Sequence, residues 1–268
     1  MRAKKRLGQH FLQPVWADKV VTAIDPHPDD RFLEIGPGPG VLTLRLAPRV
    51  AHLTAVELDR DMIEALAPQL PGNVTLVEAD VLDYDLGALT GAHRIRVAGN
   101  LPYNVSSPIL FRLLDAHRAT GGIVDATVMV QLEVAERIAA KPGTKDYGVL
   151  SILVQLHADV VPLLTLPPGA FRPAPKVRSA VIKLRFRAPA IDLADEPEFE
   201  AMVRSMFTQR RKTLLNALRA YAGSRGAQPG EALTVAGIDP GRRAETLQLS
   251  ELSRLADFFA SRPRRAVL

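Results

Sequence analysis

The segment Arg31–Gly40, which reads RFLEIGPGPG, decides the fold of this chain. A short apolar run of the kind found in buried strands leads into three closely spaced glycines, and an amphipathic stretch follows at Val41–Val50. A strand, a glycine-rich loop and a helix in this order open a parallel α/β sheet, which binds its ligands at the carboxyl ends of its strands. The segment therefore predicts an α/β fold with a ligand site at residues 36–40.

The same alternation of apolar runs and amphipathic stretches continues to about residue 130. The runs expected as strands are 31–35, 52–58, 73–79, 94–100 and 123–132. Repeated strand–helix units predict a mostly parallel sheet with helices on both faces. The loops that follow the strands are therefore the places to search for functional residues.

Two further apolar runs, Gly148–Val161 and Val177–Phe186, flank a proline-rich segment. They are predicted to pair as a long antiparallel hairpin that closes one edge of the sheet. Beyond Pro189 the pattern becomes helical, with two breaks rich in glycine and proline. The expected organisation is an α/β domain at residues 1–188 and a small all-helical domain at residues 189–268.

Composition excludes several classes of protein. The 268 residues are 47% apolar and 24% charged, which is typical of a globular chain. The absence of cysteine excludes disulfides, thiolate metal sites and cysteine nucleophiles, and the six scattered histidines predict no metal site. The longest apolar stretch, Val149–Phe171, is interrupted by polar residues and prolines, so no membrane helix is expected. The basic N-terminal residues lead into no apolar core, so the protein is expected to lack a secretory signal and to stay in the cytoplasm.

The charge of the chain indicates an anionic partner. The net charge is +5, and the 34 basic residues comprise 26 arginines and 8 lysines, a mixture suited to phosphate binding. Two clusters are predicted to contact RNA, with a solvated surface as the alternative for each. Their residues are Lys4, Lys5 and Arg6 in the first and Arg210, Arg211 and Lys212 in the second.

The glycine loop favours a cofactor without phosphates. Val41 stands where the dinucleotide fingerprint needs a third glycine, and two prolines in the loop remove backbone N–H donors that a pyrophosphate needs. S-adenosylmethionine fits better, because Gly36 and Gly38 allow close approach of the backbone and Glu34 supplies negative charge near a cationic ligand. The alternative is a glycine-rich turn that serves only strand–helix packing.

Acidic residues end the next two predicted strands. Glu57 lies 17 positions after Gly40, close to the offset at which a carboxylate accepts hydrogen bonds from ribose hydroxyls. Asp80 follows the third strand, where a carboxylate can accept a hydrogen bond from an adenine amino group. Either residue alone is also compatible with a helix N-cap, but together with the glycine loop they indicate cofactor binding.

The loop after the fourth strand carries the chemistry. Asn100, Leu101, Pro102 and Tyr103 form an Asn-Leu-Pro-Tyr turn. The Asn100 side-chain oxygen and the Leu101 carbonyl can accept the two N6 hydrogens of an adenine, which directs the nitrogen lone pair toward a methyl donor. Pro102 fixes the turn, and the ring of Tyr103 offers a face on which a base can stack. This turn predicts methylation of an exocyclic amino group, with a plain structural turn as the alternative.

These residues belong to a longer set of motifs in one order. KKRLGQHFL lies near the start, FRPAPKVRSAV at 171–181 and MFTQRRKTLLNAL at 206–218. With them the chain resembles the ribosomal RNA adenine dimethyltransferase family from about residue 3 to residue 260, and is most similar to its bacterial branch that acts on the small subunit. The resemblance implies a class I (Rossmann-like) methyltransferase domain and a helical C-terminal domain.

The resemblance also implies roles for individual residues. It implies contacts to S-adenosylmethionine from His10, Leu12, Gly36, Glu57, Asp80 and Asn100, with His10 standing where many members have asparagine. It implies that Asn100, Leu101 and Tyr103 hold the target base and that Phe171 forms a second aromatic wall. Phe11, by contrast, is interpreted as a core residue.

The function implied by the resemblance is dimethylation of two adjacent adenines in a hairpin near the 3′ end of 16S rRNA, within the small ribosomal subunit, by a monomer. One alternative is a 23S rRNA adenine methylase, against which stand GPGPG, the leucine of the Asn-Leu-Pro-Tyr turn and QRRKTLLNAL. A second alternative is a non-catalytic RNA-binding assembly factor on the same fold. A nicotinamide oxidoreductase is disfavoured by the glycine spacing.

Overall fold

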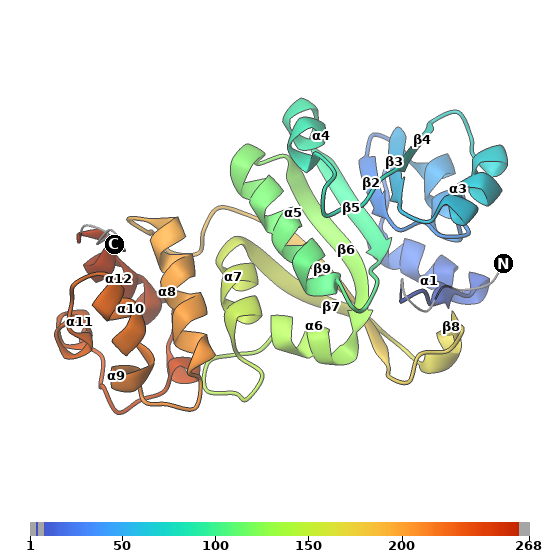
Figure 1. Cartoon of the computed structure of the whole chain (residues 1–268). Helices are drawn as coiled ribbons and strands as arrows, with labels where there is room; N and C mark the ends of the chain where they lie inside the picture. Colours follow the sequence, from blue (N-terminus) through green and yellow to red (C-terminus); the bar gives the residue numbers. More distant parts are fainter. Residues whose placement is uncertain (1–3, 5–7, 263–268) are drawn as a thin grey trace. The chain divides into compact units, whose positions relative to one another are not determined.

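The computed structural model describes residue 4 and residues 8–262. The chain divides into two compact units, one formed by residues 1–135 and 158–187 and the other by residues 136–157 and 188–268. The last part of the second unit starts at Ala188, one residue before the start of the helical domain expected from the sequence. Residues 136–157, however, belong to the second unit and not to the α/β domain in which the sequence placed them (Figure 1).

The first unit is built on a seven-stranded mixed sheet with the order β4-β3-β2-β5-β6-β9-β7. The parallel strands are β2 (Arg31–Ile35), β3 (His52–Glu57), β4 (Val74–Glu78), β5 (Ile95–Asn100) and β6 (Ile123–Gln131). The chain order reverses between β2 and β5, and such a reversal opens a crevice at the carboxyl ends of the two strands. The predicted α/β class with a mostly parallel sheet is confirmed.

An antiparallel hairpin completes the sheet beside β6. Strands β7 (Ala158–Leu166) and β9 (Ser179–Phe186) pair with each other, and β9 pairs with β6. The predicted hairpin is confirmed, but its first run is shorter than expected because Val149–His157 forms helix α7. Six of the nine residues of that run are apolar and they do not alternate strictly with polar residues, so the pattern alone does not separate a buried helix from a buried strand.

Helices cover the sheet of the first unit. Their bounds are α1 (Pro14–Ile24), α2 (Thr43–Leu46), α3 (Arg60–Leu66), α4 (Leu86–Ala92) and α5 (Ser106–Thr120), and α6 (Leu132–Ile138) follows β6. Helix α1 begins with proline at its first position and buries Ala17, Val20, Val21 and Ile24 in the main core. A separate two-stranded sheet joins β1 (Phe11–Leu12) to β8 (Phe171–Arg172), which bridges the N-terminal segment to the proline-rich loop.

The second unit is all-helical within its described residues. Besides α7 it contains α8 (Glu196–Thr208), α9 (Leu214–Ala217), α10 (Arg219–Ser224), α11 (Pro229–Ala236) and α12 (Leu249–Ala260). Helix α7 contacts α8, and the Gly143 amide donates to the Glu245 carbonyl (2.7 Å). These contacts explain why residues 136–157 group with the helical unit. No helix of the described part of the chain is both long and apolar enough to cross a membrane.

Candidate active site

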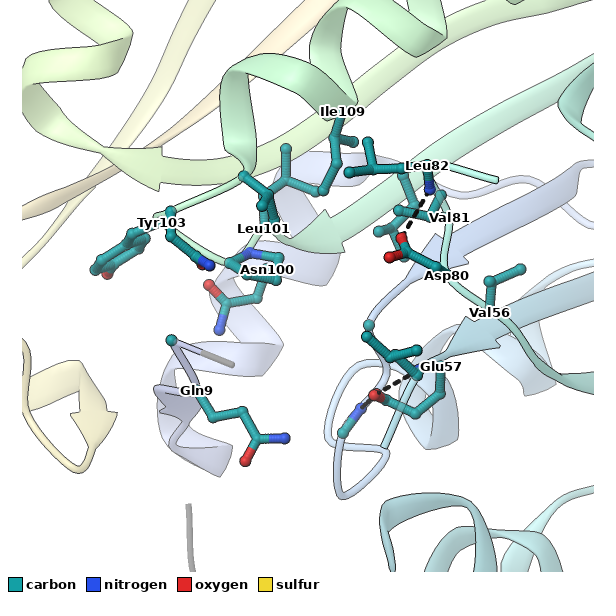
Figure 2. A pocket seen from close by; sticks show the side chains of 18 of the residues that line it. Gln9, Val56, Glu57, Asp80, Val81, Leu82, Asn100, Leu101, Tyr103 and Ile109 are labelled. Atoms are coloured by element: carbon teal, nitrogen blue, oxygen red, sulfur yellow. Dashed lines mark hydrogen bonds between the residues drawn. The ribbon is translucent and has the colours of Figure 1, made fainter. Parts of the chain in front are cut away.

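A cavity of about 160 Å³ lies at the carboxyl edge of the parallel strands in the first unit. Its walls come from the ends of four strands and the loops after them, at residues 35, 36, 38, 56–58, 79–82 and 100–105, together with residues 8–11. Figure 2 shows Glu57 and Asp80 on one side of this cavity and Asn100, Leu101 and Tyr103 on the other. The fold thus brings the separate strand-end motifs into one pocket.

The glycine loop after β2 presents its backbone to the pocket. Gly36 and Gly38 have positive φ angles of 65° and 54°, a conformation that favours glycine. A β-carbon at Gly36 would meet no atom within 4 Å, whereas one at Gly38 would lie 3.1 Å from the Phe11 ring. Gly36 therefore offers an open stretch of backbone that a ligand can approach closely.

Glu57 ends β3 with a buried carboxylate. Its Oε2 accepts a hydrogen bond from the Gly38 amide (2.9 Å), and its Oε1 accepts from the amides of Leu58 (2.9 Å) and Asp59 (2.8 Å). The two amides on Oε1 use that oxygen's two lone pairs, while Oε2 keeps one. Glu57 thus ties the glycine loop to the end of β3 and has one oxygen with capacity for a ligand hydroxyl.

Asp80 lies two residues beyond the end of β4. Its Oδ1 accepts from the Leu82 amide (2.9 Å), and its carbonyl accepts from the amides of Asp83 and Tyr84. These bonds form a compact turn that holds the half-buried carboxylate at the pocket wall. Val81 and Leu82, which sequence reasoning did not single out, supply apolar surface beside it.

Asn100, the last residue of β5, has one satisfied and one unsatisfied side-chain group. Its Nδ2 donates to the His10 carbonyl (2.6 Å), and this bond orients the amide. Its Oδ1 is buried and has no hydrogen-bond partner in the described part of the chain. A buried acceptor without a donor costs free energy, so Oδ1 is available to an N–H donor of a ligand in this pocket. The Leu101 amide donates to the Met129 carbonyl (3.1 Å), and the Pro102 carbonyl accepts from Val105 (3.1 Å), which closes the turn.

Tyr103 is held at both its hydroxyl and its ring. The hydroxyl forms a 2.6 Å hydrogen bond with Ser179 Oγ at the start of β9, and the ring stacks on His10 with the centroids 5.3 Å apart. Burial raises the pKa of Tyr103 above the usual value of a tyrosine. Ser179 was not identified from the sequence, because nothing local links it to a residue 76 positions earlier.

The two phenylalanines near the site, Phe11 and Phe171, differ in position from the sequence-based interpretation. Phe171 is only 1% exposed, belongs to the main core and does not line the pocket, so the prediction that it forms an aromatic wall is not supported by its position. Phe11, interpreted from the sequence as a core residue, lines the pocket with its ring beside Gly38. In the β1–β8 pair Leu12 lies opposite Phe171, and both of these side chains point into the core.

Family comparison agrees with this geometry. The sequence profile of the family described as "Ribosomal RNA adenine dimethylase" matches residues 1–261. The chain belongs to this family. The predicted rRNA adenine dimethyltransferase, a methyltransferase enzyme, is thereby confirmed.

Two curated relatives are named ribosomal RNA small subunit methyltransferase A. The protein of Geobacter metallireducens is 46% identical over 265 residues, which cover 96% of this chain and 95% of the relative. The protein of Anaeromyxobacter sp. (strain K) is 47% identical over 268 residues, which cover 95% and 93% of the two chains.

Solved structures of related enzymes share the fold. A dimethyladenosine transferase from Plasmodium falciparum superposes with a TM-score of 0.74 at 24% identity, covering 92% of this chain and 96% of that one. The 23S rRNA methyltransferase ErmE gives a TM-score of 0.67 at 27% identity, covering 92% and 98%. The class I methyltransferase fold expected from the sequence is thus confirmed.

Leu12 and Glu34 lie beside a second, smaller cavity of about 30 Å³ that also borders Asn100. Leu12 is buried in the core and does not line the main pocket, so a side-chain contact to the cofactor, as the resemblance implied, is not supported. Glu34 is 1% exposed, and burial raises the pKa of its carboxyl to about 7. It is therefore a weaker source of negative charge near pH 7 than the sequence suggested.

Two of the basic residues predicted to contact RNA are already engaged. Lys4 pairs with Asp59 (2.5 Å) and Asp61 (2.7 Å). Arg210 pairs with Glu245 (2.9 Å) and donates to the carbonyls of loop residues in the second unit. These cations face carboxylates, so their position does not support the predicted RNA contacts.

The remaining basic residues of the two clusters differ in status. Arg211 and Lys212 are exposed, as an RNA contact requires, and no ion pair to either is found among the described residues. Lys5 and Arg6 lie outside the described residues.

Within residue 4 and residues 8–262, no cluster of histidine and acidic side chains is arranged to hold a metal ion.

Proposed function

We propose that this protein transfers methyl groups from S-adenosylmethionine to N6 of two adjacent adenines in a hairpin near the 3′ end of 16S rRNA. The observation that carries the proposal is the buried Oδ1 of Asn100, at the end of β5 beside the open backbone of Gly36, which no described residue reaches with a hydrogen bond. A hydrogen-bond acceptor at this position can bind the N–H of an amino group. It does not protonate the nitrogen, so the nitrogen lone pair stays available.

The pocket fits the proposed cofactor. Gly36 can face the methionine part of the ligand, and the remaining lone pair of Glu57 Oε2 can accept from a ribose hydroxyl. Asp80 can accept from the adenine amino group, and Leu58, Val81 and Leu82 supply apolar surface for the ring. S-adenosylmethionine, when bound, supplies the methyl group at its sulfonium.

Asn100 and its neighbours act on the target base. The N6 lone pair of adenine is delocalised into the ring, so the free amino group is a weak nucleophile. Hydrogen bonds from N6 to Asn100 Oδ1 and to the Leu101 carbonyl favour a pyramidal nitrogen whose lone pair faces the methyl donor. Tyr103, held by Ser179, supplies a ring for stacking the base. The nitrogen loses its proton after transfer, so no strong general base is needed.

The 16S target is favoured by the relatives. Proteins named for the small subunit are 44–47% identical to this chain, whereas ErmE, named for 23S rRNA, is 27% identical. The net charge of +5 and the exposed Arg211 and Lys212 suit an RNA partner. The protein is proposed to act in the cytoplasm, as a monomer, on the small ribosomal subunit or its precursor.

A methylation assay on ribosomal subunits tests the proposal. The protein is incubated with labelled S-adenosylmethionine and either small or large subunits from a methylation-deficient strain, and the modified nucleotides are mapped. Dimethylation of two adjacent adenines of 16S rRNA is expected. Transfer to 23S rRNA would replace the proposed substrate, and cofactor binding without transfer to either subunit would indicate a non-catalytic assembly factor.

A further inference from the structure

Asp59, two residues beyond Glu57, carries a buried carboxylate with three hydrogen-bond donors. Lys4 Nζ lies 2.5 Å from Oδ1, Gln9 Nε2 lies 2.8 Å from Oδ2, and the Asp61 amide lies 3.1 Å from Oδ1. Burial by itself would raise the pKa of Asp59, but these donors hold it below its usual value. The carboxylate is therefore charged at neutral pH, and its main partners come from the N-terminal segment.

The same segment forms a wall of the pocket. Gly8, Gln9, His10 and Phe11 line the cavity, and the Lys4 amide donates to Gln9 Oε1 (2.8 Å). Lys4 and Gln9 thus act on Asp59 together, as a charged donor and a neutral donor on its two oxygens. Lys4 Nζ lies 2.5 Å from Asp59 and 2.7 Å from Asp61, and these two ion pairs within the protein favour a structural role for Lys4 over an RNA contact.

Asp59 also connects this wall to the opposite side of the pocket. Its amide donates to Glu57 Oε1 (2.8 Å), and Glu57 in turn accepts from the Gly38 amide. The segment is also held by the bond from Asn100 Nδ2 to the His10 carbonyl (2.6 Å), by the hydrogen bond between His10 Nδ1 and the Pro173 carbonyl (2.7 Å) and by the β1–β8 pair. Gln9 therefore links the segment, through Asp59, to Glu57, and the adjacent residue His10 links it to Asn100.

We propose that Lys4 and Asp59 are positioning residues that fasten residues 8–11 across the cofactor pocket, so that an ionic contact outside the pocket sets cofactor affinity. The proposal rests on the proposed function in that the cofactor is taken to be S-adenosylmethionine. The Lys4 side chain is 31% exposed, whereas the Asp59 side chain is fully buried. Loss of Lys4 therefore leaves a buried carboxylate without its cation and weakens the hold on the segment.

The test compares Lys4→Ala and Lys4→Arg with wild type. Arg60→Ala is the matched control, because Arg60 is a neighbouring cation in an exposed pair with Glu64. Hydrogen–deuterium exchange of the amides of residues 8–12 is measured without ligand, and the dissociation constant of S-adenosylmethionine is measured by calorimetry without RNA. Lys4→Ala is expected to speed the exchange and to raise the dissociation constant about three- to tenfold. Lys4→Arg is expected to restore both, and Arg60→Ala to change neither.

Salt gives a second readout. The wild-type dissociation constant is expected to rise between low and high salt, and that of Lys4→Ala to respond less, because the ionic contact is already absent.

Unchanged exchange and unchanged cofactor affinity in Lys4→Ala would overturn the proposal, and a loss of RNA affinity alone would indicate that Lys4 contacts RNA. Faster exchange with unchanged cofactor affinity would also overturn it. If the wild type itself fails to bind S-adenosylmethionine, the proposed function fails, while the ligand-free exchange still decides whether Lys4 fastens the segment.

Discussion

Asn100 shows how a single residue can serve both the fold and the chemistry. One end of its amide donates to the His10 carbonyl, and the other end is buried with no donor from the described residues. The arrangement keeps the acceptor in place before any substrate arrives, which is the condition under which a hydrogen bond contributes most to a transition state. Tyr103 is prepared in the same manner by Ser179 and His10.

Asn100→Ala is expected to lower the turnover number on the order of 10²- to 10³-fold, because one of the two acceptors for N6 is lost. Monomethyladenine has a single N6 hydrogen, so the second transfer depends on fewer contacts and the monomethyl product is expected to accumulate. Mass spectrometry of digested RNA at saturating cofactor measures both effects, with cofactor affinity determined separately. A wild-type rate and product would show that the turn is only structural.

Ser179→Ala is expected to raise the KM for the ribosomal subunit while leaving cofactor affinity unchanged, because Tyr103 loses the partner that fixes its ring. The loss of one buried hydrogen bond, about 1 kcal/mol, predicts a change of about fivefold. Ser179→Thr keeps the hydroxyl and is expected to restore much of the wild-type value. Equal KM values in steady-state assays of Ser179→Ala and wild type would remove Ser179 from the positioning of the base.

At the scale of elements, strand β2 buries an ionisable side chain, Glu34, in an environment that disfavours its charged form. Ile35 and Glu34 both lie at its buried end, and Glu34 Oε2 has no hydrogen-bond partner among the described residues. Burial, with a smaller effect of the Glu57 charge, raises the pKa of Glu34 to about 7. The folded protein therefore holds a proton on Glu34 at pH values at which the unfolded chain has released it.

The raised pKa of Glu34 predicts that the stability of the protein depends on pH. The contribution of Glu34 to the free energy of unfolding is full below about pH 4.5 and falls as the pH rises toward 7, by on the order of 2–3 kcal/mol. Glu34→Gln, which cannot ionise, is expected to lack this part of the dependence. Urea unfolding at pH 5 and pH 8 measures the difference between the two proteins, with the exposed Glu64→Gln as the control. A parallel pH profile for Glu34→Gln and wild type would contradict the prediction.

At the scale of the whole molecule, the chain crosses from one unit to the other more often than its sequence pattern suggests. The first unit resumes at residue 158 after residues 136–157 have joined the helical unit. Gly143 and Arg210 help to hold this inserted segment through Glu245 and neighbouring carbonyls. The helical unit is therefore assembled from two separate parts of the sequence.

This assembly separates two roles within one basic cluster. Arg211→Ala combined with Lys212→Ala is expected to weaken binding to the small subunit and to reduce the slope of log affinity against log salt by roughly one to two, because both side chains are exposed. Cofactor affinity is expected to stay unchanged. Arg210→Ala is instead expected to lower the stability of the protein, because it removes the partner of Glu245. Filter binding over a salt series measures the slope, and a wild-type slope in the double variant would exclude phosphate contacts at both positions.

The sequence by itself determined the parallel sheet and the edge of that sheet at which the loops containing Gly36, Glu57, Asp80 and Asn100 meet around one cavity. Each of these features is local, because a strand and the loop after it lie within a few residues of each other. In a parallel sheet the carboxyl ends of the strands meet at one edge, so local patterns were sufficient to assemble the site.

Tertiary structure alone decided the features that depend on distant partners. Which of Phe11 and Phe171 enters the core follows from the register of β1 with β8, two short strands about 160 residues apart. Lys4 has carboxylate partners that lie more than 50 positions away in the sequence. The hydroxyl of Tyr103 forms a hydrogen bond with Ser179, 76 positions away. Helix α7 formed where a strand was expected, because its apolar residues pack within the helical unit. In each case the side chain permitted either outcome, and the packing partner brought close by the fold selected one.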